Sequence, residues 1–243
     1  MAENSGIAWT THTWNPWQGC TKVSPGCANC YMFRDKTRYG QNPEVVVRSK
    51  PPTFHKPLSW KDPAFVFTCS WSDWFHEAAD GWRDEAWAII KATPHLTYQI
   101  LTKRPERILA HLPWGAYGDP WPNVWLGVSV ENQRWRERMD VLATIPAALR
   151  FVSAEPLLGP LTLDRSPFPA LRSFGWVIAG GESGADAREC NPEWLRTLRD
   201  ECAAAGVPFF LKQLGGHPDA RAHEKAVLDG HTFTQIPEPE RTP

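Results

Sequence analysis

The chain has 243 residues, of which 42% are hydrophobic and 22% are charged, a composition that suits one sizeable folded core rather than a disordered chain. Its formal net charge of −1 excludes the overall basic character typical of many nucleic-acid-binding domains. The N-terminus lacks a basic segment followed by an apolar run, and no stretch approaches the roughly 20 apolar residues that cross a bilayer. We therefore expect a soluble, cytoplasmic protein without a membrane segment.

Short apolar runs rich in β-branched residues recur along the chain and predict strands. The first lies near Ile7–Trp14. The others follow at intervals close to the length of one βα unit, and they are Phe65–Thr68, Thr97–Leu101, Val124–Val130, Leu149–Val152, Trp176–Ala179 and Pro208–Leu211.

Helical patterns fill several of the gaps between these runs, with expected starts at Asp80, Pro105, Asn132 and Asn191. The last is the clearest, because Asn191 is a good cap, Pro192 suits the first helical position and Gly206 supplies a stop. The proline-rich gap from Pro156 to Ser173 predicts a long loop.

Strands that alternate with helices predict an α/β fold with a parallel sheet and right-handed crossovers. Six or seven such strands favour a full or partial TIM-type barrel, and a doubly wound open sheet is the alternative. We expect one barrel domain over residues 1–216, with the cysteine-rich segment near its start, and a C-terminal extension over residues 217–243 that is partly disordered, above all from Pro237 onward.

Polar side chains follow the predicted strands, at the edge of a parallel barrel where active sites form. Ser153 and Glu155 are two residues apart and therefore share one face of a strand. The same spacing relates Ser129 to Glu131 and Gly180 to Glu182, while Lys103 ends another strand and the Gly180-Gly181 pair permits close approach of a ligand. The candidate site residues at this edge are thus Lys103, Glu131, Glu155, Gly180, Gly181, Glu182 and Ser183.

Three of the six cysteines crowd into the segment GCTKVSPGCANCY, a grouping that favours metal or redox chemistry over disulfide bonds. Cys27 and Cys30 have the spacing that lets two thiolates meet at one metal centre, and a turn at Pro25-Gly26 can return Cys20 to them. Three thiolates suit a [4Fe–4S] cluster with one open iron. A structural zinc site needs a fourth ligand, for which His12, Cys69 and His76 are candidates.

This segment, with the preceding WTTHTWNPW, resembles a family of phage- and bacterium-associated proteins that carry a three-cysteine motif and are regarded as radical-SAM-like. The resemblance continues to about Gly216 through FTCSWSDWFHE, QILTKRPERI, VWLGVSVEN, RFVSAEPLLGP, WVIAGGESG and FFLKQLGG. The CANCY segment is also similar to the end of the cluster motif in spore photoproduct lyase, a DNA-repair radical-SAM enzyme. The gap between Cys20 and Cys27 is longer than in the general radical-SAM pattern.

The resemblance implies an iron–sulfur enzyme that cleaves S-adenosylmethionine (SAM) to a 5′-deoxyadenosyl radical, which abstracts hydrogen from an unidentified substrate. In this hypothesis Cys20, Cys27 and Cys30 hold the cluster, and the segment from Gly180 to Ser183 holds the polar groups of SAM. Lys103, Glu131 and Glu155 face the substrate or SAM. A DNA, RNA or nucleotide substrate and a partner protein are both compatible with a phage-like gene.

A zinc-containing nucleic-acid-binding module without catalysis is the main alternative. Residues 20–61 carry eight Lys and Arg residues but only two acidic ones, with aromatic residues between them, a composition suited to phosphate contacts and base stacking. A solvated basic surface explains the same composition.

A carboxylate-based barrel hydrolase that uses Glu131, Glu155 or Glu182 is a third hypothesis, because paired acids suit glycoside hydrolysis. It leaves the cysteines unexplained.

Overall fold

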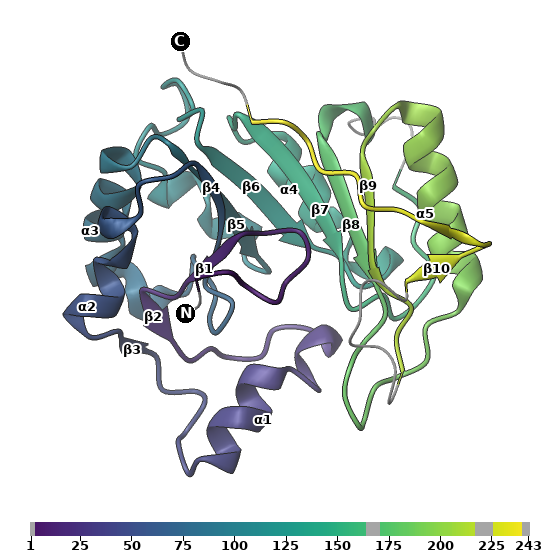
Figure 1. Ribbon diagram of the computed structural model, residues 1–243, viewed down its shortest axis with the longest axis horizontal. Helices are drawn as coiled ribbons and strands as arrows, with labels where there is room; N and C mark the ends of the chain where they lie inside the picture. Colours follow the sequence, from purple (N-terminus) through teal and green to yellow (C-terminus); the bar gives the residue numbers. More distant parts are fainter. Residues whose placement is uncertain (1–2, 164–170, 217–225, 240–243) are drawn as a thin grey trace.

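The fold is built on a parallel sheet of seven strands that curls into a half-barrel (Figure 1). The computed structural model describes residues 3–163, 171–216 and 226–239. The strand order follows the chain without reversal: β1 (His12–Trp14), β4 (Ala64–Thr68), β5 (Leu96–Thr102), β6 (Val124–Ser129), β7 (Leu149–Ala154), β8 (Trp176–Gly180) and β9 (Phe209–Gln213). The predicted partial barrel is confirmed, whereas a doubly wound sheet would reverse its strand order.

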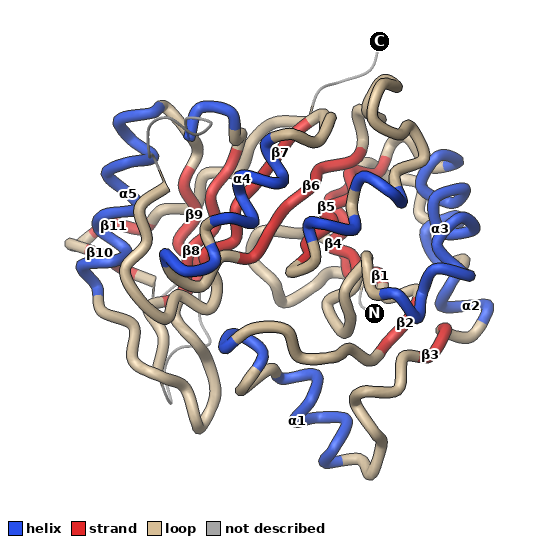
Figure 2. The backbone as a smooth tube through the Cα atoms, turned by 180° about the vertical axis from the view of Figure 1, so that it is seen from behind, coloured by secondary structure: helices blue, strands red, loops and turns tan. Residues whose placement is uncertain are grey.

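Helices and 3₁₀ turns connect successive strands and cover the convex face of the sheet (Figure 2). They are α3 (Asp80–Ala92), η3 (Glu77–Ala79), η4 (Pro105–Arg107), η5 (Leu109–His111), η6 (Gln133–Trp135), α4 (Glu137–Ala143), η7 (Leu171–Ser173) and α5 (Pro192–Ala205). With helices on one face, the concave face and the carboxyl edge of the strands are free to receive other segments. The concave face receives Trp9 from the N-terminal segment and Ile236 from the C-terminal one, whereas the carboxyl edge receives the long segment between β1 and β4.

The predicted helix at Asn191 is confirmed as α5, since the Asn191 side chain accepts from the Glu193 N–H and Gly206 is left-handed with φ 69°. The prediction at Pro105 is wrong, because that segment forms only the two 3₁₀ turns η4 and η5. Leu112 stands before Pro113 and has an extended backbone with ψ 133°, as the steric demand of a following proline requires. The segment therefore ends before a regular α-helix is established.

Two buried clusters lie on opposite faces of the sheet, because successive side chains in a strand alternate. Val152 belongs to the large cluster beneath the helices, whereas its neighbour Phe151 belongs to an aromatic cluster on the concave face. Gly127 admits the Phe151 ring, since a Cβ at that glycine would lie 2.3 Å from it. Trp125, Phe151 and Trp176 of the aromatic cluster sit in the first halves of their strands. The carboxyl halves are thereby left for polar groups.

The chain between β1 and β4 lies below the carboxyl edge of the sheet (Figure 1). It contains β2 (Trp17–Gln18), η1 (Pro25–Cys27), α1 (Tyr31–Arg38), β3 (Val47–Arg48), α2 (Pro51–Phe54) and η2 (Lys56–Ser59). The helix α1 was not predicted, because the segment YMFRDKTR is mainly polar and buries only Met32 and Lys36. β2 pairs antiparallel with β3, and this pairing joins the two ends of the segment that contains η1 and α1.

Part of the predicted C-terminal extension runs along β9. The short strands β10 (Val227–Leu228) and β11 (His231–Thr232) form a hairpin. Beyond it, the Leu211 N–H donates to the Phe233 carbonyl at 2.8 Å and Trp176 Nε1 donates to the Gln235 carbonyl at 2.8 Å. Residues 217–225 and 240–243, on which part of the predicted disorder falls, lie outside the described residues.

Across the described part of the chain, no helix combines the length and apolar character that a bilayer span needs.

Candidate metal centre at the carboxyl edge of the sheet

Cys20, Cys27 and Cys30 lie on one loop, residues 20–30, called here the cysteine loop. Cys27 ends the η1 turn, where its N–H donates to the Ser24 carbonyl at 2.9 Å, and Cys30 is the N-cap of α1. The Cys20 N–H donates to the Pro43 carbonyl at 2.9 Å. All three thiols are free and half-buried. Local turns therefore present three sulfur ligands from one short segment.

An aspartate–arginine pair holds the first part of the cysteine loop. Arg104, just after β5, lies 3.2 Å from Asp73 Oδ2 and donates to the Thr21 carbonyl at 3.1 Å. Its Nη1 also lies 3.7 Å from Cys20 Sγ. Asp73 accepts in addition from the Lys103 N–H at 2.9 Å, so the pair is tied to the ends of β4 and β5.

A glutamate–arginine pair holds the middle of the loop. Glu131, which follows β6 and is fully buried, accepts from Arg138 Nη1 at 3.0 Å and from the Ser24 hydroxyl. The Gly26 backbone packs directly on this carboxylate, because a Cβ there would lie 2.5 Å from Glu131 Oε1. Only glycine permits this approach without displacing Glu131.

A second glutamate–arginine pair holds the end of the loop. Glu182, which follows β8, accepts from Arg188 through its backbone N–H, Nε and Nη2. It also accepts from Asn29 Nδ2 at 2.9 Å, and Arg188 donates to the Pro25 carbonyl at 3.0 Å. Burial opposes ionisation of Glu182, but the hydrogen bonds from Arg188 and Asn29 outweigh it and hold the pKa of this carboxyl below its usual value.

The cysteine loop is thus bound to the sheet by three acid–arginine pairs, namely Asp73–Arg104, Glu131–Arg138 and Glu182–Arg188. Their carboxylates follow β4, β6 and β8, alternate strands of the half-barrel. The oxygens of Glu131 and Glu182, which sequence analysis assigned to substrate and SAM, are engaged by protein donors. The paired arginines escaped that analysis, although Arg138 and Arg188 each follow their acid within seven residues, a spacing that could have indicated them.

The other predicted site residues lie on the same edge of the sheet. Lys212 in β9 donates to Glu155, which follows β7, and both side chains are partly exposed. Ser183 forms an isolated parallel β-bridge with Gly216 through the backbone. Gly181 serves packing, since a Cβ there would lie 2.4 Å from the Leu214 carbonyl oxygen. The structure therefore places these residues at the same edge of the sheet. Unlike the three acid–arginine pairs, the Glu155–Lys212 pair does not hold the cysteine loop.

Burial raises the pKa of Cys20 to about 12, with Asp73 adding to the effect and Arg104 opposing it. Without a metal, Cys20 is thus a neutral thiol that must lose its proton to become a ligand. Within the described ranges, no three or more His, Cys, Asp and Glu side chains are grouped so that they could hold a metal ion. A four-iron cluster binds each thiolate through a different iron, so its ligands are spaced more widely than those of one ion. Three free thiols on one loop fit that donor set.

Of the candidate fourth ligands for zinc, His76 contacts the cysteine loop, whereas His12 lies at the other end of β1. His76 accepts from the Ala78 N–H at 3.2 Å through Nδ1, and its Nε2 lies 3.1 Å from the Thr21 hydroxyl. His12 stacks on Trp60 at the start of β1, the strand end remote from the cysteine loop. Cys69 is buried, and burial raises its pKa well above the usual value.

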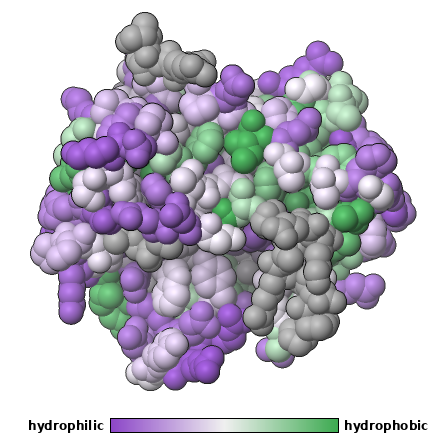
Figure 3. Space-filling view, in the orientation of Figure 1, coloured by the Kyte–Doolittle hydropathy of each residue, from purple (hydrophilic) through white to green (hydrophobic). Residues whose placement is uncertain are grey.

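The basic segment over residues 20–61 has many of its charges matched within the protein. Arg48 pairs with Glu85 at 2.7 Å, Lys56 pairs with Glu3 at 2.7 Å, and Lys36 is buried. The surface at the lower edge of Figure 3, where α1 and its loops lie, is largely hydrophilic. The positive charge offered to a nucleic acid is therefore smaller than the composition indicates.

Comparisons with curated proteins and with solved structures gave no match. Residues 4–237 match the family described as "Protein of unknown function (DUF5131)". That match covers both the half-barrel and the cysteine loop. The chain therefore belongs to the DUF5131 family.

Proposed function

We propose that this protein is a radical-SAM-type iron–sulfur enzyme in which Cys20, Cys27 and Cys30 hold a [4Fe–4S] cluster. The observation that carries the proposal is the position of the cysteine loop, which three acid–arginine pairs bind to the carboxyl edge of a parallel half-barrel. That edge is where parallel α/β barrels place their chemistry. The three thiols supply one ligand fewer than a closed structural metal site requires, which leaves a position for a cofactor.

When bound, the cluster supplies the electron that cleaves SAM reductively. The chain's own residues hold and orient the reactants. Glu131 and Glu182 act through the cysteine loop and are positioning residues. The Glu155–Lys212 pair lies at the same edge and is the polar pair that we assign to SAM or substrate. In the segment from Gly180 to Ser183, the Gly180 carbonyl accepts from the Leu157 N–H and Gly181 bonds to Gln213 through both its N–H and its carbonyl, so SAM would have to displace these bonds to use that backbone. The concave aromatic cluster beneath them excludes water from the floor of the site.

Anaerobic reconstitution with iron and sulfide tests the cluster. We expect a brown protein with about four irons per chain, each thiolate being bound to one iron. Replacing the three loop cysteines with serine should abolish iron binding. Cys202→Ser is the matched control, because Cys202 is buried in α5, outside the cysteine loop. Iron retained by the triple variant would contradict the assignment.

Reductive cleavage of SAM is tested separately, by measuring 5′-deoxyadenosine after addition of SAM and a reductant to the reconstituted protein. The triple cysteine variant should form none, and the Cys202→Ser protein should form as much as the wild type. A protein that takes up only zinc, and binds DNA or RNA in a salt-dependent manner, would instead support the zinc module. That outcome would depend on the exposed basic residues of the segment 20–61 that have no ion-pair partner among the described residues, namely Lys22, Arg38, Lys50 and Lys61.

A further inference from the structure

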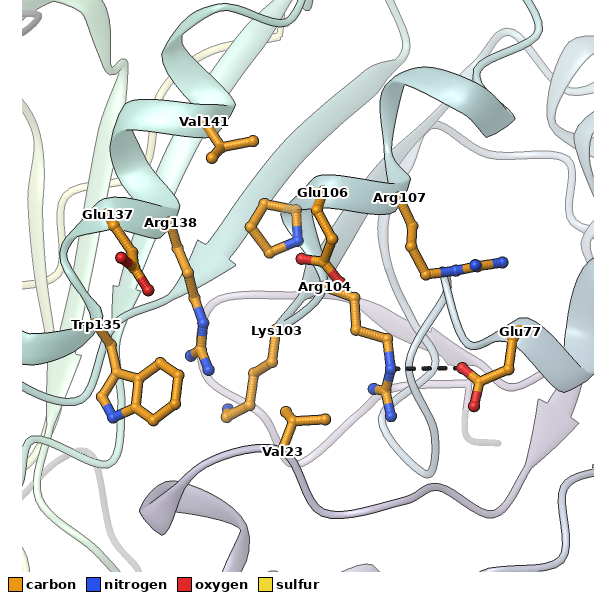
Figure 4. Close-up of a pocket in the computed structure, with 11 residues that line it drawn as sticks. Val23, Glu77, Lys103, Arg104, Glu106, Arg107, Trp135, Glu137, Arg138 and Val141 are labelled. Atoms are coloured by element: carbon orange, nitrogen blue, oxygen red, sulfur yellow. Dashed lines mark ion pairs between the residues drawn. The ribbon is translucent and has the colours of Figure 1, made fainter.

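A cavity of about 450 Å³ lies beside the cysteine loop, between the turn that follows β5 and the helix that follows β6 (Figure 4). Val23 of the cysteine loop forms one wall, so a bound molecule would sit against the proposed cluster-binding segment. The volume is in the range of small-molecule sites. Pro105, Val141 and Trp135 supply further apolar or aromatic surface.

The deeper part of the cavity has more positive than negative charge. Arg104 is paired with Asp73 at 3.2 Å and Arg138 with Glu131 at 3.0 Å. Lys103 has only a remote partner, because its Nζ lies 3.8 Å from Glu131 Oε1, and that oxygen already accepts from the Ser24 hydroxyl. Arg104 also lies 3.8 Å from the exposed Glu77. The three cations therefore share two buried carboxylates and one exposed carboxylate, and Lys103 has no hydrogen-bonded counter-charge among the described residues.

A half-buried ammonium without a hydrogen-bonded acceptor is costly, and an anionic ligand removes that cost. Figure 4 shows Lys103 between Arg138 and Arg104. An oxyanion placed there would contact its ammonium group.

The acids of the cavity lie at its rim. Glu77, Glu106 and Glu137 are exposed, and the last two have no ion-pair partner among the described residues. Exposed charges are partly screened by water and salt, so these acids reduce the buried positive charge without cancelling it. They do repel a ligand that carries several negative groups. The charges thus favour one phosphate on a compact organic body over a nucleic-acid backbone.

We propose that this cavity binds a small phosphomonoester, such as a nucleoside monophosphate, with its phosphate on Lys103 and its organic body against Val23, Pro105 and Val141. The role of this molecule as a substrate rests on the proposed function, whereas its binding does not. The proposal narrows the substrate of the cluster-binding site to a phosphate-bearing small molecule.

Isothermal titration calorimetry on the full chain at low salt tests the site with adenosine 5′-monophosphate, inorganic phosphate and adenosine. We expect the monophosphate to bind more tightly than phosphate, and adenosine to bind at least tenfold more weakly than the monophosphate. Lys103→Met should weaken monophosphate binding about tenfold or more, since it removes a charge-assisted hydrogen bond. Lys91→Met, which removes an exposed lysine at the end of α3 outside the cavity, should bind like the wild type. Glu106→Gln should bind more tightly, because it removes a repulsive rim charge.

Equal affinity for adenosine and its monophosphate would overturn the proposal, as would wild-type binding by Lys103→Met or no binding at millimolar ligand. Phosphate that binds as tightly as the monophosphate would support the oxyanion site and refute the contribution of the organic body. Matching thermal unfolding of Lys103→Met and wild type shows that the variant is folded. The titrations use both iron-free and reconstituted protein. A protein that takes up iron but does not bind the monophosphate counts against this site. A protein that binds the monophosphate but takes up no iron counts against the proposed function.

Discussion

Replacing Gly26 with alanine tests the contact between the cysteine loop and the sheet. The added Cβ would lie 2.5 Å from Glu131 Oε1 and 2.7 Å from Glu131 Cγ, both shorter than any normal contact. Glu131 is fully buried and is held by Arg138 and Ser24, so it has no free space into which to withdraw. Overpacking of this kind costs about 1–3 kcal/mol of unfolding free energy.

For a chain of this size, each 1 kcal/mol lowers the melting temperature by about 2–4 °C, so Gly26→Ala should melt several degrees below wild type. Thermal and urea unfolding of the iron-free protein measure the effect, and iron content after reconstitution measures the displacement of the loop. Gly81→Ala is the matched control, because Gly81 lies in α3 and its added methyl group would have no atom within 4 Å. Wild-type stability and iron content in Gly26→Ala would refute the close packing of the loop on Glu131.

Three further predictions concern the other contacts of the cysteine loop and the fold. Because the pKa of Glu182 is lowered by folding, its stabilisation is present above the unfolded value near 4.5 and is lost as the pH falls through the lower folded pKa. Urea unfolding of Glu182→Gln should therefore show lower stability at neutral pH and a smaller loss on acidification; an unchanged pH profile would count against the Arg188 contact. When reconstituted proteins are dialysed against a chelator, Arg104→Met should lower iron retention more than Arg199→Met, which breaks ion pairs on α5 away from the cysteine loop. Asn191→Ala should cost about 1 kcal/mol in urea unfolding, because it removes the cap of α5, and no change would refute that cap.

Sequence patterns predicted the strands well because each pattern is local. The runs near Val124 and Trp176 are apolar on both faces, as strands covered on both sides must be, and they became β6 and β8. The Asn191-Pro192 start and Gly206 stop predicted α5 for the same reason. Local signals failed where the chain is mainly polar, as in α1, or where a proline such as Pro113 ends a segment early.

The candidate site was predicted only in part, because its contacts join residues far apart in the chain. The spacing of the cysteines and the acids at the strand ends could be read directly. That Glu131 would be covered by Ser24, or that Glu182 would bind Asn29, depends on how the excursion after β1 folds back beneath the sheet. No periodic pattern in the sequence indicates how this segment folds back against the sheet. The predicted acids Glu131 and Glu182 do lie at strand ends, but their spacing in the chain does not distinguish contact with a ligand from contact with the loop.

The use of buried ion pairs to hold the cysteine loop has a physical consequence. A buried pair such as Glu131–Arg138 is seldom more stabilising than apolar residues of the same size, because both charges lose their hydration. The advantage of an ion pair is its directionality, because carboxylate and guanidinium groups accept and donate hydrogen bonds along fixed directions. Here Glu131 accepts from the Ser24 hydroxyl, Arg188 donates to the Pro25 carbonyl and Arg104 donates to the Thr21 carbonyl. Apolar packing would allow the loop to slide along the sheet edge, whereas these bonds fix its register. We infer that the pairs serve the position of the thiols more than the stability of the fold, so conservative variants of the pairs should change iron binding more than they change the free energy of unfolding.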